Sequence, residues 1–304
     1  MQSIGDGNSR KKNFAMEPYV THEEAKVQPQ RSYLICATPR SGSTLLCEAL
    51  TNTGLAGRPE EYFEALKDTG LPRRPGEYFT DVEDAELVEL LNEYSQNEEG
   101  YQVQRDSVSY TEYLERVIAK GTTPNRVFGA KIMWGYLDDF VSNLQTIPQY
   151  RQLAAPELFA TIFPNLSYVT MTRRDKVRQA ISLWRAIQTQ AWKEEEDAHP
   201  NQKHHHKELF FHFAAIDHLK RQLEEHDAAW QRFFYEHGIE PFAVVYEDLV
   251  LEYEATALRI LSYLGIAEQP LFAGRRMKQQ SDALSEQWVR DYYQVKREKE
   301  EVPQ

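Results

Sequence analysis

The chain has 304 residues, of which 41% are hydrophobic and 27% charged, and its formal net charge is −12. That length is enough for one large domain or two small ones with a sizeable core. The acidic charge argues against non-specific nucleic-acid binding, so any anionic ligand must be bound by local basic residues.

The chain begins with a polar, aperiodic segment, and we expect residues 1–31 to form a disordered tail. It lacks the apolar core of a signal peptide, and no apolar run in the chain reaches the ~18 residues of a membrane span. The two cysteines, Cys36 and Cys47, do not form a disulfide framework and are expected to be buried. These features predict a cytoplasmic protein without a transmembrane segment.

The first predicted strand, residues 33–37, runs through a turn into a helix at 42–53. Further β-rich runs follow at 128–133, 166–171 and 241–246. Helical patterns lie between and after them, at 84–95, 110–119, 136–145, 156–162, about 176–192, 209–237, 253–264 and 284–295. Alternating strands and helices predict an α/β fold with a central parallel sheet flanked by helices. We expect one domain over residues 32–295 and a C-terminal tail at 296–304.

The turn after the first strand has the composition of an anion site. Backbone N–H groups and the positive end of the helix dipole converge where a strand turns into a helix. Candidate ligand groups there are Arg40, Ser41, Gly42, Ser43 and Thr44. The triphosphate-binding P-loop has Lys after its second Gly, whereas here Gly42 is followed by Ser43 and the cation Arg40 precedes it. The turn therefore predicts a phosphate or sulfate site without the triphosphate–magnesium signature.

Polar residues follow two other predicted strands. Arg173 and Arg174 come after the strand at 166–171, and Glu247 and Asp248 after the strand at 241–246. In a parallel sheet, ligands bind outside the carboxyl ends of the strands. The two arginines are predicted to clasp a second phosphate, and the alternative is a solvated charge pair at a helix start.

Five motifs in this order resemble the bacterial trehalose 2-sulfotransferase family, and the resemblance covers roughly residues 32–295. They are Thr38–Leu46, Gly57–Phe63, Gly129–Trp134, Arg173–Thr189 with Trp192, and Ser285–Trp288. The resemblance implies a P-loop-like sulfotransferase fold. It also implies sulfuryl transfer from 3′-phosphoadenosine 5′-phosphosulfate (PAPS) to a hydroxyl of a carbohydrate or glycolipid, by a homodimer that needs no metal.

The resemblance also implies roles for individual residues. Residues 38–44 would take the 5′-phosphosulfate end of PAPS and Arg173 its 3′-phosphate. Arg178 stands where the family has a serine that holds this phosphate, and Ser182 lies one turn further on. Either of these two side chains is therefore a candidate for that contact. The basic residues near the C-terminus are weaker candidates to cover the 3′-phosphate: Arg275, Arg276 and Lys278.

Glu61 matches the catalytic glutamate of the family, and its neighbour Glu60 is the alternative within the same motif. Transfer to an alcohol requires a base within hydrogen-bond reach of the acceptor hydroxyl, and a carboxylate meets this need. We expect in-line displacement, with Glu61 accepting the proton and Arg40 stabilising charge on the leaving phosphate. No histidine occurs between His22 and His199, which fits a glutamate base.

Other features leave alternatives open. Consecutive His204, His205 and His206 converge poorly on one ion, so we expect a solvated loop at 193–208, with a lid over the acceptor as a further possibility. Trp134 is predicted either to stack on a sugar or to pack in the core. The competing functions are a P-loop-type small-molecule kinase and a non-catalytic nucleotide-binding module.

Overall fold

The computed structural model describes residues 28–67, 73, 75–79, 82, 84, 87–89, 91, 109–189, 192, 209–274 and 283–301. Its centre is a four-stranded sheet of β1 (Arg31–Ala37), β2 (Val127–Met133), β3 (Leu166–Thr172) and β4 (Phe242–Val245). All pairs are parallel, in the order β2-β1-β3-β4. The predicted α/β fold with a central parallel sheet is therefore confirmed.

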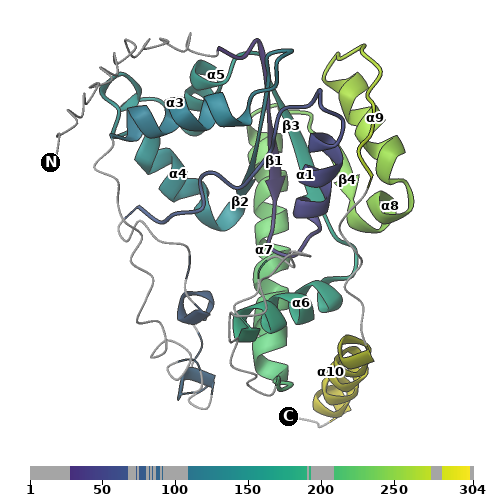
Figure 1. Ribbon diagram of the computed structural model, residues 1–304. Helices are drawn as coiled ribbons and strands as arrows, with labels where there is room; N and C mark the ends of the chain where they lie inside the picture. Colours follow the sequence, from purple (N-terminus) through teal and green to yellow (C-terminus); the bar gives the residue numbers. More distant parts are fainter. Residues whose placement is uncertain are drawn as a thin grey trace, which may run out of the picture.

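Helices cover both faces of the sheet (Figure 1). On one face lie α1 (Ser43–Thr51), α8 (Tyr246–Leu251) and α9 (Tyr253–Tyr263); on the other lie α3 (Tyr110–Gly121), α4 (Leu137–Leu144), α5 (Ala155–Ile162) and part of α7 (Phe213–Glu236). Short 3₁₀ turns occur at Pro75–Tyr78, Trp134–Tyr136 and Pro148–Tyr150. Within the described ranges, no helix is both long and apolar enough to cross a membrane.

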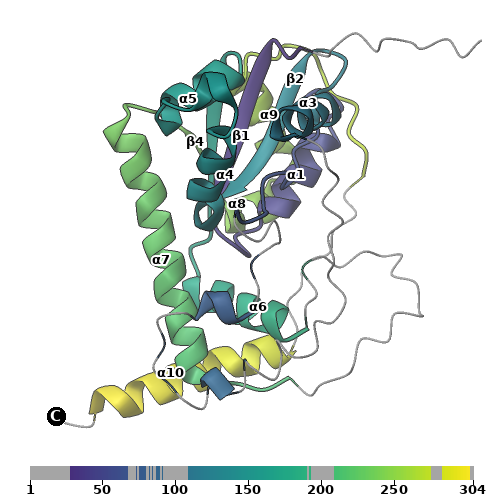
Figure 2. The ribbon, with the colours of Figure 1, turned by 90° about the vertical axis from the view of Figure 1, so that its left-hand side faces the viewer.

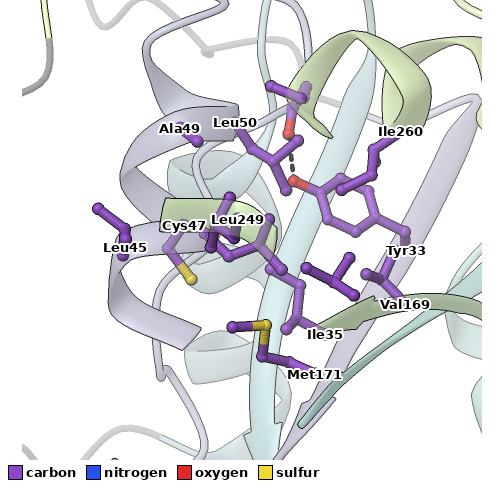
Figure 3. Packing of buried hydrophobic residues seen from close by; sticks show 14 of the residues in the cluster. Tyr33, Ile35, Leu45, Cys47, Ala49, Leu50, Val169, Met171, Leu249 and Ile260 are labelled. Atoms are coloured by element: carbon purple, nitrogen blue, oxygen red, sulfur yellow. Dashed lines mark hydrogen bonds between the residues drawn. The ribbon is translucent and has the colours of Figure 1, made fainter. Parts of the chain in front are cut away.

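Alternate residues of β1 face the two layers, as the period-two geometry of a strand requires. Tyr33 and Ile35 pack with α1 and α9, as Figure 3 shows, whereas Leu34 and Cys36 pack against the helices of the other face. The Tyr33 hydroxyl is buried and donates a 2.6 Å hydrogen bond to the carbonyl of Ala56. β1 is buried throughout its apolar length, and the turn that follows it is consequently anchored at the centre of the sheet.

Helix α7 extends beyond the sheet and joins two cores (Figure 2). Its C-terminal half, with Trp230, packs against the sheet, and its N-terminal half, with Leu219, packs against α6 (Lys176–Thr189) and α10 (Ala283–Glu301). The two halves of α7 meet beside the carboxyl ends of the strands. Asp227, near the middle of the helix, contacts Thr38 after β1 and Thr172 at the end of β3.

Several predicted boundaries differ from the structure. α6 ends at Thr189 rather than near Trp192, and α10 continues to Glu301, past the predicted helix end at 295. α8 was not predicted, since its six residues are too few to show a helical period. Residues 1–27 of the predicted tail at 1–31, the His-rich segment 193–208 and most of the predicted helix at 84–95 lie outside the described residues. Arg31, predicted to lie in the tail, is the first residue of β1.

Candidate active site

The turn between β1 and α1 has the backbone of an anion cradle. Gly42 caps α1 at φ 91°, and a Cβ there would lie 2.3 Å from the ring of Tyr246, so glycine is required. Arg40 also has a left-handed φ of 59°, which is unusual for a residue with a side chain. No side chain caps α1 among the described residues, so its first N–H groups stay available to a ligand.

A buried polar network holds this turn from behind. Asp227 on α7 accepts hydrogen bonds from Thr38 at 3.0 Å and Thr172 at 2.5 Å, and its carboxylate pairs with Lys176 at 2.5 Å. Gln179 then donates to the Thr38 hydroxyl at 3.0 Å and to the carbonyl of Pro39 at 2.7 Å. The network joins the ends of β1 and β3 to α6 and α7, and it fixes the start of the turn.

Two polar groups beside the turn are buried without a hydrogen-bond partner among the described residues: the hydroxyl of Ser41 and the Nε of Arg173. A buried polar group that lacks a partner costs roughly 1–3 kcal/mol, so a ligand that supplies one would be stabilised there. The Arg173 guanidinium lies 4.7 Å from the ring centroid of Tyr246, and burial lowers its pKa. It is still a cation at neutral pH, since arginine is not deprotonated in proteins.

Arg40 and Ser182 are brought together, because Arg40 Nε donates to the Ser182 hydroxyl at 2.9 Å. A second nitrogen of Arg40 donates to the carbonyl of Trp192 at 2.9 Å. Ser182 thus lies beside Arg40, at the end of the site that β1 supplies. Ser43 is buried and Thr44 half-buried in the first turn of α1, as the sequence pattern implied.

The two arginines after β3 do not form a common clasp. Arg174 is exposed and pairs with both carboxylate oxygens of Asp248, at 2.9 and 2.6 Å, so the solvated alternative holds for this residue. Arg178 pairs with Glu286 of α10 through both terminal nitrogens and with Asp175 at 2.9 Å. Arg173 is therefore the cation after β3 that remains without a carboxylate partner in the described part of the chain.

Glu60 and Glu61 occupy contrasting environments. Glu60 lies at the surface, half-exposed, and pairs with Lys120 at 2.6 Å. The side chain of Glu61 is only 19% exposed and pairs at 2.8 Å with Lys131, whose side chain is 5% exposed. Burial on its own would lower the pKa of Lys131, but the Glu61 carboxylate outweighs burial, and the pKa is raised.

Lys131, Asp227 and Lys176 were missed by the sequence analysis. A lysine within the apolar strand at 128–133 is a signal that a buried partner exists, because lysine is almost never fully buried unpaired. Asp227 gave no comparable signal, since an acidic residue on a long amphipathic helix is ordinary. Trp134 packs edge-on against Trp230, with ring centroids 5.1 Å apart, which supports its packing alternative.

Comparison with known proteins agrees with this geometry. Residues 32–295 match the family model of the Stf0 sulphotransferases. The chain is 32% identical over 263 residues to trehalose 2-sulfotransferase of Mycobacterium tuberculosis, covering 86% of this chain and 94% of that protein. The chain belongs to the Stf0 sulphotransferase family. It is a sulfotransferase, and this decides against the kinase and the non-catalytic alternatives.

Two further relatives were found. Trehalose 2-sulfotransferase of Mycolicibacterium smegmatis is 32% identical over 265 residues, with the same shares of each chain covered. The solved sulfotransferase domain of the Synechococcus PCC 7002 olefin synthase overlaps 91% of this chain and 97% of its own, at 16% identity and a TM-score of 0.42. A TM-score this low carries no weight for the site.

The remaining predicted residues lie outside the part of the chain that the structure describes. Arg275, Arg276 and Lys278 lie in the undescribed range 275–282, and His204, His205 and His206 lie in 193–208. Among the residues that the structure describes, no group of three or more His, Cys, Asp or Glu side chains is arranged to hold a metal ion. Cys36 and Cys47 are both buried, and the two are not joined in a disulfide.

Proposed function

We propose that this sulfotransferase moves a sulfuryl group from PAPS to a hydroxyl of a carbohydrate. The observation that supports this most strongly is the pair of unsatisfied buried groups, Ser41 and Arg173, at the ends of the neighbouring strands β1 and β3. These groups suit a donor that carries anionic groups at two separated positions, as PAPS does. Residues 38–44 would hold its 5′-phosphosulfate and Arg173 its 3′-phosphate.

The other predicted donor contacts follow from their surroundings. Ser182 would act through Arg40, because its hydroxyl accepts a 2.9 Å hydrogen bond from Arg40 Nε. This bond would orient the guanidinium toward the sulfuryl group. Arg178 would reach the 3′-phosphate only by exchanging its pair with Glu286. A direct contact from Arg178 stays a prediction, and Arg173 is the stronger candidate.

Glu61 is the proposed general base. The acceptor oxygen would bond to sulfur as its proton passes to Glu61, while the bond from sulfur to the 5′-phosphate oxygen breaks. Arg40 and the N–H groups of Gly42 to Thr44 would stabilise the charge that grows on the leaving phosphate. Lys131 would hold the Glu61 carboxylate in place through the 2.8 Å contact between them.

The carbohydrate acceptor is proposed from the relatives, both of which are named trehalose 2-sulfotransferases. Trehalose is therefore the first acceptor to test, followed by other sugars and glycolipids. That the enzyme is a cytoplasmic homodimer stays a prediction.

A radiolabelled transfer screen tests the proposal. Enzyme and [³⁵S]PAPS are incubated with trehalose, other disaccharides, monosaccharides and glycolipids, in EDTA to remove divalent ions. We expect label in at least one sugar product without added magnesium. Label in none of these acceptors would contradict the carbohydrate proposal.

A further inference from the structure

One histidine lies at the level of the strand ends, and its side chain has no hydrogen bond among the described residues. His226 is half-buried on α7, next to Asp227, whose carboxylate holds the turn after β1. The pKa of His226 is lowered to about 4, chiefly by burial and also by the Arg73 charge, while Asp227 opposes the shift. The imidazole is therefore neutral at physiological pH, with one donor and one acceptor nitrogen to offer.

Arg73 lies beside the same histidine. Its guanidinium donates to the carbonyl of Gly135 at 2.9 Å and lies 5.5 and 5.7 Å from the ring centroids of Tyr78 and Tyr136. No carboxylate pairs with it in the described ranges, in contrast to Arg174 and Arg178. A half-buried cation without a counter-ion retains donors for a ligand.

An aromatic pair links this cation to the catalytic turn. The rings of Tyr78 and Trp192 are stacked, with centroids 6.2 Å apart and an interplanar angle of 23°, and Trp192 is 37% exposed. The Trp192 carbonyl accepts the hydrogen bond from Arg40. The exposed ring of Trp192 therefore belongs to a residue that contacts Arg40, the side chain that would contact the sulfuryl oxygens.

The proposed base lies close to the same cluster. The pKa of Tyr136 is raised to about 12, chiefly by burial, and the Glu61 charge contributes to the rise. The pKa of Tyr78 is raised by burial as well, and Glu61 contributes there too. The Glu61 charge therefore acts on both tyrosines over whose rings Arg73 lies.

From these contacts we propose that Arg73, His226, Tyr78 and Trp192 form the subsite that binds the acceptor sugar. This inference rests on the proposed function and assigns the acceptor side of the same site. A pyranose has C–H faces that pack on aromatic rings and hydroxyls that need both donors and acceptors. The exposed ring of Trp192, backed by the buried ring of Tyr78, offers the apolar surface. Arg73 offers the donors, and neutral His226 one group of each kind.

Steady-state kinetics with trehalose and PAPS test the assignment, through Arg73→Met and His226→Gln. We expect each to raise the KM for trehalose about 10-fold or more, the effect of losing a hydrogen bond at a charged or buried group. The KM for PAPS and the rise in melting temperature caused by 3′-phosphoadenosine 5′-phosphate (PAP) should stay within about 2-fold of wild type. Arg232→Met, an exposed position on α7, is the matched control and should change neither constant.

Three further variants guard against a folding defect. Arg73→Lys keeps the charge and should recover part of the lost trehalose affinity, and Trp192→Phe keeps an aromatic ring and should raise the KM less than Trp192→Ala. An unchanged KM for trehalose in Arg73→Met and His226→Gln would overturn the subsite, as would an equal rise in the KM for PAPS. If the wild type sulfates no sugar, the carbohydrate proposal fails and this assignment fails with it.

Discussion

The proposed donor side and the proposed acceptor side of the site are built differently. The donor side comprises residues 38–44, Arg173 and the network around Asp227, and it is supported by the ends of β1 and β3 and by α6 and α7. The acceptor side comprises Glu61, Arg73, Tyr78, Trp192 and His226, and only His226 stands on a long helix. Strands and helices hold the residues proposed to bind the donor. The segments between these elements supply most of the residues that would select an acceptor.

We expect the largest effect from removing the proposed general base, Glu61, on the acceptor side. Glu61→Gln should lower kcat by about 10²–10⁴, the usual contribution of general base catalysis, and leave PAP binding intact. Glu60→Gln is the matched control, because Glu60 forms only a half-exposed pair with Lys120. Equal turnover in the two variants, measured with [³⁵S]PAPS, would remove Glu61 from the role of base.

The next effect concerns the stability of the donor side. Asp227→Ala should lower the free energy of unfolding by about 3–5 kcal/mol, because it leaves the largely buried Lys176 ammonium unpaired. Glu224→Ala removes an i,i+4 pair with Lys220 on the same helix and should cost only about 0.3–0.5 kcal/mol. Urea unfolding measures both, and a difference below ~1 kcal/mol would contradict the supporting role of the network.

A smaller effect separates the two anion positions within the donor side. Arg173→Ala should weaken PAP binding about 10–100-fold, since a hydrogen bond to a charged group contributes ~1.5–3 kcal/mol. Binding of adenosine 5′-phosphosulfate, which lacks the 3′-phosphate, should change little. Isothermal titration of both ligands measures this, and equal losses would dissociate Arg173 from the 3′-phosphate.

We expect the smallest effect to be a pH dependence of the free energy of unfolding, caused by His226, which lies where the two sides meet. The folded-state pKa of His226, about 4, is below its unfolded value, so the unfolded chain binds more protons. Its contribution to stability is complete above about pH 6.5 and is lost as the pH falls toward 4. Between about pH 7 and pH 5 this amounts to ~2 kcal/mol, and His226→Gln should flatten the urea-derived profile by that amount. An identical slope in the variant would show that His226 is not buried as a neutral group.

The sequence carries more signals for the proposed donor side than for the proposed acceptor side, and the reason is the length of chain between contacting residues. Residues 38–44 form one continuous turn whose composition carries the anion signal without help from the rest of the fold. Asp227 reaches Thr38 only because α7 crosses the end of the sheet, which no local pattern encodes. The role of Glu61 came from a family motif, and its buried pair with Lys131 depends on the packing of a loop over β2.

The same reasoning explains why residues that are close in sequence have different partners in the structure. Arg173 and Arg174 are adjacent in sequence, yet the chain turns between β3 and α6, so one side chain faces Tyr246 and the other pairs with Asp248. Ser182 and Arg178 both lie on α6, but they face Arg40 and α10 respectively. Which face of a helix meets which neighbour is a tertiary property, and a period alone does not specify it.

Ligand-dependent melting of the full chain tests the central claim most directly, that the turn after β1 and Arg173 together form a PAPS site. With EDTA present, PAP should raise the melting temperature in a concentration-dependent way, and ATP with magnesium should raise it much less. A rise with ATP and magnesium and none with PAP would contradict the account.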